Sequence, residues 1–464
     1  MKLAGLALAM ALGASPAVAD PAATAAALRD KALADPTAYE VVRSLTTEVG
    51  PRLAGSPAAA RARDWGLAKL KALGLQNVHA EPFQITAWAR GPESAEVTAP
   101  YPHALTIIGL GGSVGTPAGG IEAEIALFHS YAELLAVPPG GLTGKIAVVT
   151  QPMPRTQDGS GYGALSPARR KGPKEAEKRG AVGYLIRSLA TSDSRLPHTG
   201  AIDLEPKIPA AALGVPDAEL LDRLVAAGKP VRVRLTLAST STPNAPAWNV
   251  VGEIPGRERP DQVVMIGGHL DSWDPGEGAI DDGAGVAITV AVAHLIAGLP
   301  ERPRRTIRVV MFGDEEMDFS GKAFGAAHLG EAAGIVAVGE ADIGSDQAWS
   351  VQLPKGGVGA PQLAALAQTL APLKVVTAGE PALYAGSDFG PLQVNGGVPG
   401  FSIRQDASRY FDIHHSADDT LDKVDPEHLR QVVATWAPLV WLIADSDIDF
   451  RALATAAPAP AAPR

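Results

Sequence analysis

The chain has 464 residues, enough for two or three domains of about 150 residues each. Hydrophobic residues make up 46% of the sequence and charged residues 19%, which excludes a disordered, charge-rich chain. The formal net charge of −10 argues against nucleic acid as a partner. Cysteine is absent, so disulfides, thiolate metal sites and cysteine nucleophiles are excluded. Any metal ion must therefore be bound by histidine, aspartate and glutamate.

The first 19 residues have the pattern of a secretory signal peptide. Lys2 is followed by an apolar run over residues 3–14 and then by small residues that end at Ala19. An apolar run of about a dozen residues is shorter than the roughly 20 needed to span a bilayer. We therefore expect cleavage after Ala19, export to the periplasm or the medium, and no integral membrane segment in the mature chain.

The residues that follow predict a larger domain with an insertion. Residues 22–75 have helical spacing, and we assign residues 20–117 to the first part of the larger domain. From residue 118 short β-type runs alternate with Gly/Pro-rich turns, which predicts an inserted, mainly β module over residues 118–240. The sequence STSTPNAPA, residues 239–247, is typical of an inter-domain linker.

Beyond the linker, strands and helices alternate. Apolar strand-like runs occupy residues 250–253, 263–266 and 306–312, and helical runs occupy residues 285–297 and 321–329. This alternation predicts an α/β fold with a central mixed, mostly parallel sheet flanked by helices. We assign residues 241–450 to the second part of the larger domain. Residues 451–464 are rich in alanine and proline and predict a disordered tail.

Polar side chains follow the apolar runs of this second half. His269 and Asp271 come directly after one run, and Glu315 with Glu316 after the next. Further polar groups are found in the segments Asp281-Asp282-Gly283, Glu340-Ala341-Asp342 and His414-His415 to Asp419. Because working residues of open α/β sheets gather beyond the strand ends, we expect these groups to converge. Their carboxylates would repel one another unless cations lay between them. Two divalent cations about 3.5–4 Å apart that share a carboxylate would satisfy the cluster and suit hydrolysis.

The order of these motifs (H-L-D, D-D-G-A-G, E-E, E-A-D and H-x-x-x-D-T) resembles the M28 family of co-catalytic zinc exopeptidases. It is most similar to the carboxypeptidase Q (plasma glutamate carboxypeptidase) branch and its bacterial aminopeptidase and dipeptidase relatives. The segment VGPRLAGS, residues 49–56, is similar to the N-terminal segment of that family. The resemblance also implies that the insertion is a protease-associated domain.

The resemblance implies a role for each motif residue. It implies two Zn²⁺ per chain, a metal-bound water as the nucleophile, Glu315 as general base and Asp271 as the carboxylate that holds the second N–H of a ligand histidine. Tyr384 would stabilise the oxyanion, the alternative being a tyrosine at a strand edge with its hydroxyl in water. A cis peptide is expected between Asp281 and Asp282. The metal ligands would be His269, Asp281 as the bridge, Glu316, Asp342 and His415. Register favours Asp281 over Asp282 and His415 over His414.

The implied activity is release of the N-terminal residue from short unblocked peptides or dipeptides. Short peptides are therefore the expected partners, and a homodimer is one option for assembly. Two alternatives keep the same fold: a glutaminyl cyclase-like zinc transferase, and a non-catalytic peptide-binding relative. A third is a serine hydrolase, because Gly111-Gly112-Ser113-Val114-Gly115 matches G-x-S-x-G. That motif needs a helix directly after the serine, and Thr116-Pro117 disfavours one.

Overall fold

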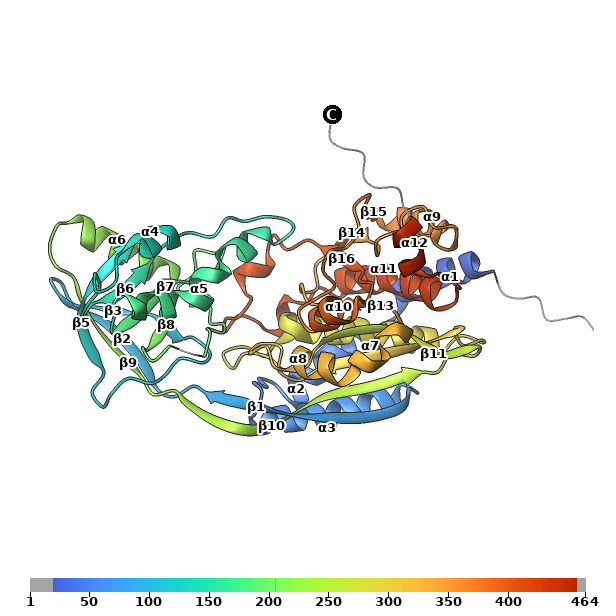
Figure 1. Cartoon of the computed structure of the whole chain (residues 1–464), viewed down its shortest axis with the longest axis horizontal. Coiled ribbons are helices and arrows are strands. Elements are labelled where there is room, and N and C mark those ends of the chain that lie inside the picture. The colour runs from blue at the N-terminus through green and yellow to red at the C-terminus, as the bar shows by residue number, and fades with distance from the viewer. Residues whose placement is uncertain (1–19, 205, 457–464) are drawn as a thin grey trace, which may run out of the picture.

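The computed structural model describes residues 20–204 and 206–456. The predicted signal peptide and residues 457–464 lie outside the described residues. Two lobes make up an elongated molecule (Figure 1). The larger lobe contains both ends of the described chain, and the smaller lobe is formed by the middle of the sequence.

A five-stranded mixed sheet forms the centre of the larger lobe. Its order is β1 (Gln76–Ala89), β10 (Thr240–Ile254), β12 (Arg305–Phe312), β11 (Arg259–His269) and β13 (Ile335–Glu340). β11 pairs in parallel with β12 and β13, whereas β10 pairs antiparallel with β1 and β12. The prediction of a mostly parallel sheet was therefore wrong: half of the pairings are antiparallel, because β1 and β10 form a long two-stranded ribbon at one edge.

Both faces of this sheet are buried. Val264 and Ile266 of β11 belong to one hydrophobic core, and the alternating residues Val263 and Met265 belong to another. Successive side chains of a strand point to opposite faces, so a strand covered on both sides is apolar throughout. This explains the uninterrupted apolar runs of the sequence.

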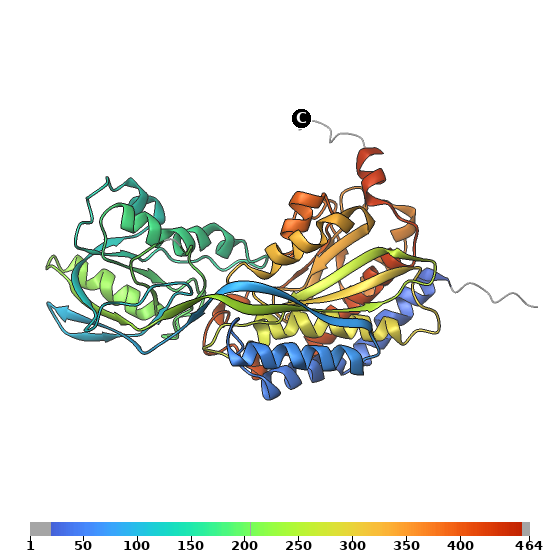
Figure 2. The same cartoon turned by 60° about the horizontal axis from the view of Figure 1, so that its bottom comes forward.

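Helices cover the two faces unequally. One face carries the N-terminal helices and two long buried ones, which Figure 2 shows on one side of the strands. They are α1 (Pro21–Ala34), α2 (Thr37–Glu48), α3 (Pro57–Ala72), α7 (Ala284–Ala297) and α11 (Pro426–Ala444). The other face is covered by α8 (Ser320–His328) and α10 (Gly390–Gly396), through Phe324 and Leu392.

Segment Ala279–Ala297, which includes α7, is the one stretch among the described residues that is long and apolar enough to cross a membrane. Its most apolar window is 94% buried inside the lobe. It is therefore the core helix of this lobe.

A small sheet and two short helices complete the larger lobe. The sheet order is β15 (Val376–Thr377), β14 (Ala348–Gln352) and β16 (Ser402–Gln405), and α9 (Leu366–Leu370) lies nearby. α12 (Phe450–Ala456) packs on the lobe through the buried Phe450. Arg451 donates to the carbonyls of Ile335 (2.9 Å) and Ala332 (2.8 Å). The tail predicted to begin at residue 451 is therefore helical up to residue 456.

An eight-stranded sheet with three helices forms the smaller lobe. The sheet order is β3 (His103–Leu105), β2 (Glu93–Ala99), β9 (Arg232–Leu237), β5 (Ile121–Phe128), β6 (Ile146–Val149), β7 (Gly183–Arg187), β8 (Ala210–Leu213) and β4 (Ile107–Gly109). The helices are α4 (Tyr131–Ala136), α5 (Ser160–Lys178) and α6 (Val215–Ala226). The lobe is thus α/β rather than mainly β.

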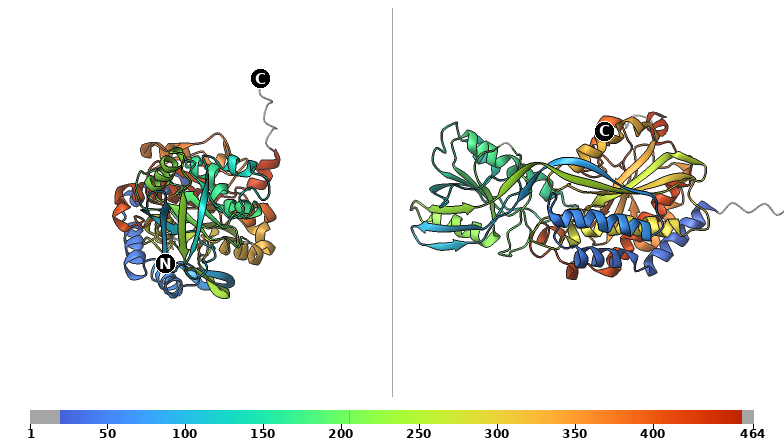
Figure 3. Two further views of the ribbon diagram at one scale, coloured as in Figure 1. Left: turned by 90° about the vertical axis from the view of Figure 1, so that its left-hand side faces the viewer. Right: turned by 90° about the horizontal axis from the view of Figure 1, so that it is seen from below.

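The boundaries of the smaller lobe differ from those predicted. Its sheet begins at Glu93, because β2 pairs antiparallel with β9, so residue 118 lies inside the lobe. The predicted linker at residues 239–247 is the first half of β10, and it pairs with β1. A register shift between Ile85 and Ala87 accommodates the prolines of this segment. The β1–β10 ribbon thus runs from one lobe to the other, as the right-hand view of Figure 3 shows.

Candidate metal centre and active site

A cavity of about 270 Å³ lies where α5 of the smaller lobe faces the strand ends of the larger one. Its volume is at the lower end of small-molecule sites. The larger lobe contributes Asp281, Glu315, Glu316, Asp318, Asp342, Ile343, Ser387, Tyr410, Phe411, His414 and His415, and α5 contributes Tyr162, Ser166, Arg169 and Arg170.

The sequence-predicted ligands are brought to this cavity by the carboxyl ends of three adjacent strands. His269 is the last residue of β11, Glu316 follows β12 and Asp342 follows β13. Asp281 lies in the turn before α7, with a cis peptide to Asp282. A Cβ at Gly285, within the D-D-G-A-G motif, would collide with the carbonyl of Ala341, so this glycine lets α7 begin close to the β13 loop.

Asp281 lies between two groups of ligand atoms. Its Oδ1 is 3.0 Å from His269 Nε2, and Asp342 Oδ1 is 3.6 Å from the same nitrogen. On its other side, Asp281 Oδ2 is 3.1 Å from His415 Nε2, which is also 3.1 Å from Glu316 Oε2. The five predicted ligands are thus brought together, with one aspartate shared between the two groups.

The atoms of this cluster lack ordinary partners. Among the described residues, Asp281 Oδ2 and Glu316 Oε1 are buried and accept no hydrogen bond. Among the described residues, three sets offer ligand atoms close enough to share a metal ion: Asp281 with His414 and His415, His269 with Asp281 and Glu316, and His269 with Asp282 and Asp342. Buried, unsatisfied carboxylate oxygens next to imidazole nitrogens are typical of metal sites, and the donors present suit one.

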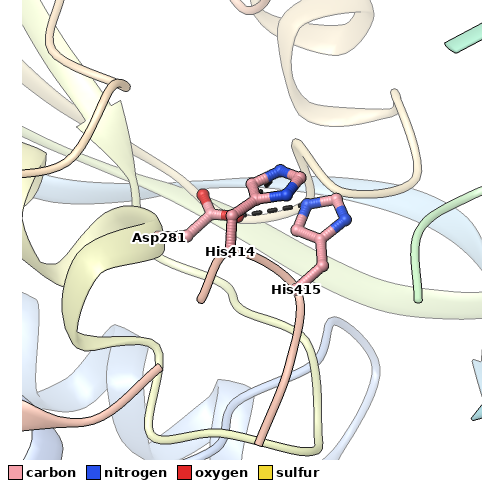
Figure 4. A group of neighbouring side chains, drawn as sticks. All are labelled: Asp281, His414 and His415. Carbon is pink, nitrogen blue, oxygen red and sulfur yellow. Dashed lines mark ion pairs between the residues drawn. The ribbon is translucent and has the colours of Figure 1, made fainter. Parts of the chain in front are cut away.

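His414 lies beside His415, and Figure 4 shows both rings next to Asp281. The two rings stack with centroids 3.5 Å apart, and His414 Nε2 is 3.6 Å from Asp281 Oδ2. The two histidines differ at the second ring nitrogen. Nδ1 of His415 lies 3.3 Å from the carbonyl of Thr199, whereas Nδ1 of His414 has no hydrogen-bond partner among the described residues. The contact with Thr199 directs Nε2 of His415 toward the cluster, as expected for a ligand. His415 also has a φ of 60°, a left-handed conformation that is uncommon for residues other than glycine.

Both carboxylate oxygens of Asp282 already accept hydrogen bonds from the backbone. Its Oδ2 accepts from His269 N (3.0 Å) and its Oδ1 from Gly285 N (2.9 Å). Both oxygens therefore hold the His269 strand end and the start of α7 together. This leaves Asp281 as the member of the pair with a carboxylate oxygen, Oδ2, that has no hydrogen-bond partner among the described residues.

Asp271 lies next to His269, but its carboxylate is hydrogen-bonded to the backbone of the glutamate turn and is not the closest acceptor to the histidine. The closest acceptor to His269 Nδ1 is the backbone carbonyl of Asp271 at 3.0 Å, and the carboxylate is 3.5 Å away. The carboxylate accepts the N–H groups of Glu315 (3.0 Å) and Glu316 (3.4 Å). Asp271 therefore holds the glutamate turn against the end of β11.

Glu315 lines the cavity without joining the ligand contacts. In the described part of the chain, no ion pair links it to a histidine, whereas Glu316 contacts His415. Burial raises the pKa of Glu315 to about 7, with a further contribution from Asp342. Burial also raises the pKa of Glu316 to about 8.

The carboxylates around the cavity carry an excess of negative charge. Burial, then neighbouring acids, raises the pKa of each of Asp314, Glu340, Asp342 and Asp388. Although burial alone would lower it, Glu316 and Asp281 raise the pKa of His415 well above its usual value. These shifts have the direction expected for buried donors whose charges bound cations would compensate.

Tyr384 lies on the lining of a neighbouring cavity rather than among the ligands. Tyr384 is 56% exposed and lines this second cavity. Ile343 lines both the second cavity and the cavity of the candidate metal centre. Burial of the ring side of Tyr384 and the nearby acids Glu340 and Glu315 raise the pKa of its hydroxyl. Its predicted role in stabilising an oxyanion stays a prediction.

Two residues that support the centre have no assigned role in the sequence patterns. Asp419 accepts the N–H groups of Ile280 (2.6 Å) and Asp281 (3.2 Å), and so holds the bridging turn. The sequence feature that could have identified Asp419 is its position four residues after His415. Arg52, from VGPRLAGS, is fully buried and donates to the carbonyls of Leu270 (2.5 Å), Glu277 (2.8 Å) and Gly278 (2.8 Å).

We expect Arg52→Met to lower the free energy of unfolding by about 3 kcal/mol or more, because it leaves several buried carbonyls unsatisfied at about 1–3 kcal/mol each. Chemical denaturation followed by circular dichroism measures the change. Arg61→Met is the matched control: Arg61 is exposed on α3, and we expect a change within about 0.5 kcal/mol. Equal stability of the two variants would contradict this role.

Ser113 does not have the environment of a nucleophile. It is buried in the smaller lobe, its Oγ accepts from Ala210 N (2.8 Å), and it donates to the carbonyl of Val114 (3.0 Å). The hydroxyl of Ser113 is thus hydrogen-bonded to the backbone on both sides. The segment after Ser113 is irregular and is not a helix. The serine-hydrolase alternative is not supported.

Sequence comparison identifies the family of the chain. Residues 249–440 match the model of Peptidase family M28. Carboxypeptidase Q of Bos taurus is 38% identical over 414 residues, which cover 88% of this chain and 85% of the relative. The chain belongs to peptidase family M28. The Homo sapiens Carboxypeptidase Q is 36% identical over 88% of this chain and 85% of its own. The predicted family is confirmed.

Solved structures of similar proteins agree with this family assignment. A Peptidase M28 precursor from Shewanella amazonensis SB2B is 40% identical, with a TM-score of 0.89 over 92% of this chain and 98% of its own. A zinc aminopeptidase from Bacillus subtilis, at 19% identity, has a TM-score of 0.64 over 89% of this chain and 96% of its own. The second likeness shows that the M28 chain shares the fold of that protein.

Proposed function

We propose that this M28 peptidase is an exported exopeptidase that uses two Zn²⁺ ions to remove the N-terminal residue of short unblocked peptides or dipeptides. The observation that carries the proposal is the position of Asp281. One of its oxygens faces His269 and Asp342, and the other faces His415 and Glu316. A single carboxylate between two sets of donors is the arrangement that a two-metal site requires.

The donor set fits zinc. Imidazole and carboxylate ligands, with no cysteine available, suit Zn²⁺ in a catalytic site. Each ion would have one histidine, one further carboxylate and a share of Asp281. When bound, such ions lower the pKa of a water molecule and polarise the scissile carbonyl.

The protein's own residues then do three things. Glu315, which makes no ligand contact among the described residues, accepts a proton as the peptide bond is attacked and returns it to the leaving amine. The free amine of the substrate would lie at the cluster around Asp281, beside the metal positions. Asp271 and Asp419 hold the glutamate turn and the bridging turn in place through backbone N–H groups.

We also propose that the smaller lobe is a protease-associated domain that limits substrate length. α5 closes one side of the cavity, and the Thr199 loop contacts His415. A cavity closed on that side admits a short peptide more easily than a long one. The segment 1–19 would direct the protein out of the cytoplasm.

A panel of peptides tests the proposal. We expect hydrolysis of dipeptides with a free amino terminus and a loss of at least about 100-fold when that terminus is acetylated, because an acetylated nitrogen offers neither a lone pair nor a positive charge at the candidate metal centre. Amino-acid release measured by chromatography gives both rates. Equal hydrolysis of free and acetylated peptides would overturn the assignment as an aminopeptidase.

A further inference from the structure

His415 is the candidate ligand that is held by the smaller lobe. Its carbonyl accepts the N–H of Thr199 (3.0 Å), and its Nδ1 lies 3.3 Å from the carbonyl of the same residue. Thr199 belongs to the smaller lobe, in the segment between β7 and β8. The carboxylates that accept the N–H groups of His269, Asp281 and Glu316 all lie in the larger lobe. The position of His415 therefore depends on how the smaller lobe is placed.

Arg90 lies where the chain first passes from the larger lobe to the smaller one, between β1 and β2. Its Nε and Nη2 donate to the two carboxylate oxygens of Asp274 (2.7 and 2.9 Å), which follows β11 in the larger lobe. Its Nη1 donates to the carbonyl of Gly109 (2.6 Å) in the smaller lobe, and Nη2 also donates to the hydroxyl of Thr199 (3.3 Å). One guanidinium thus connects the two lobes and reaches the residue that holds His415.

The hydroxyl of Thr199 is bonded on both sides. It donates to the carbonyl of Gly109 (2.8 Å) and accepts from Arg90. Glu93 accepts the N–H of Gly109 (2.8 Å) and also a hydrogen bond from Arg90 (3.3 Å). Only 13% of the Arg90 side chain is exposed. A shielded, bidentate arginine–carboxylate bond is stronger and more directional than an exposed ion pair, so Arg90 fixes this junction in one geometry.

Two tryptophans connect Arg90 with His415 by a second route. The guanidinium of Arg90 lies over the ring of Trp88, 4.9 Å from its centroid. Trp88 meets Trp273 edge-on with centroids 6.3 Å apart, and Trp273 meets the ring of His415 at 5.7 Å. A Cβ on Gly111 would collide with Trp273, so backbone of the smaller lobe lies directly against this indole. Trp273 is also the sequence neighbour of the aspartate that Arg90 binds, so the two routes act on the same segment.

We propose that Arg90 is a positioning residue that holds Thr199 of the smaller lobe against His415, and so sets the metal affinity of the position that His415 shares with Glu316. The inference rests on the proposed function, because it concerns one of the two metal positions. Loss of a group that orients a ligand histidine through its second nitrogen typically costs about 10- to 100-fold in metal affinity. Arg90 acts through Thr199, so its effect belongs at the lower end of this range. Full metal binding is thereby coupled to the contact between the lobes.

The test is a titration of the metal-depleted full chain with Zn²⁺ in competition with a chromophoric chelator, which gives the affinity of each position. We expect two Zn²⁺ positions in the unaltered protein. In Arg90→Met we expect one position to keep its affinity within about twofold and the other to bind Zn²⁺ about 10-fold more weakly. Arg90→Lys keeps the charge without the planar fork of donors, so its loss should be intermediate.

Two further variants locate the effect. His415→Ala removes one ligand, and in that background we expect Arg90→Met to cause no further loss of affinity at the remaining position. Thr199→Val removes the hydroxyl that Arg90 contacts and keeps the backbone, so it should weaken the same position in the same direction. Because the readout is a difference between two positions of one protein, a partly unfolded preparation binds less Zn²⁺ at both and does not imitate it.

Arg234→Met is the matched control. Arg234 of β9 also pairs with carboxylates, those of Glu96 (2.6 Å) and Glu122 (2.7 Å), but both partners belong to the smaller lobe. Its loss removes a positive charge and two ion pairs without touching the junction between the lobes. We expect both Zn²⁺ affinities of this variant to equal those of the unaltered protein.

The outcomes are distinct. Unchanged affinity at both positions of Arg90→Met, or an equal loss at both, would overturn the assignment of Arg90 and leave the peptidase proposal in place. If that variant does not fold, unchanged affinities in Thr199→Val have the same meaning. An unaltered protein that binds fewer than two Zn²⁺ ions would instead overturn the two-metal form of the proposed function.

Discussion

Replacing Glu315 by glutamine is expected to lower kcat by about 10³- to 10⁴-fold while the protein stays folded and retains its metal. General-base catalysis contributes on the order of 10²- to 10⁴-fold, and glutamine keeps the shape of glutamate without its basicity. Retention of metal follows from the geometry, because Glu316 rather than Glu315 contacts His415. The same argument predicts little change in KM.

The measurement is single-substrate kinetics combined with metal analysis of the purified variant. Glu301→Gln is the matched control, since Glu301 is exposed and remote from the cavity. Retained activity in Glu315→Gln would remove the proposed base. Loss of metal in the same variant would show that Glu315 is a ligand instead.

The pH dependence gives a second signature of this residue. A base must be ionised, so kcat/KM should fall as the pH drops through the pKa of Glu315. Burial raises that pKa to about 7 in the metal-free protein. Bound cations would favour the carboxylate and move the acid limb of the profile below this value.

Removal of the metal ions is expected to abolish activity, and Asp281→Asn should reproduce the effect with a loss of at least about 1,000-fold. Among the described residues, Asp281 is the one that contacts both groups of donors, so its neutralisation weakens both metal positions together. Chelation should also lower the melting temperature, because the carboxylates around the cavity would face one another without cations.

Activity, metal content and thermal unfolding, each measured before and after chelation and after Zn²⁺ is returned, test this expectation. We expect about two Zn²⁺ ions per chain in the active protein. Asp261→Asn, an exposed position on β11 away from the cavity, is the control. Full activity after exhaustive chelation would contradict the proposed chemistry, and a stoichiometry near one would contradict the two-metal form.

Much of the candidate centre could be predicted because its residues lie at positions that follow from the strand pattern. His269, Glu316 and Asp342 each follow an apolar run, and parallel strands bring such ends to one edge. The cis peptide at Asp281–Asp282, implied by the family resemblance, is present in the structure. The choice between members of a pair needed the structure, which shows both oxygens of Asp282 bonded to backbone N–H groups.

Contributions from distant segments could not be predicted in the same way. Nothing in the pattern of α5 indicates that Arg169 and Tyr162 face the cavity, because the basic run that contains them is typical of a solvated helix face. The start of the smaller lobe was misplaced for a related reason. β2 and β9 are far apart in sequence, and only their antiparallel pairing moves the boundary from residue 118 to Glu93.

By itself the sequence determined the family, the α/β character of the larger lobe and the residue types available to bind metal. These properties are local, since they depend on which residues follow each apolar run along the chain. The tertiary structure alone decided which oxygens of the acidic cluster have no hydrogen-bond partner and which helix closes the cavity. Those properties depend on contacts between segments that may be more than a hundred residues apart, such as Thr199 with His415, and no periodicity along the chain encodes such contacts.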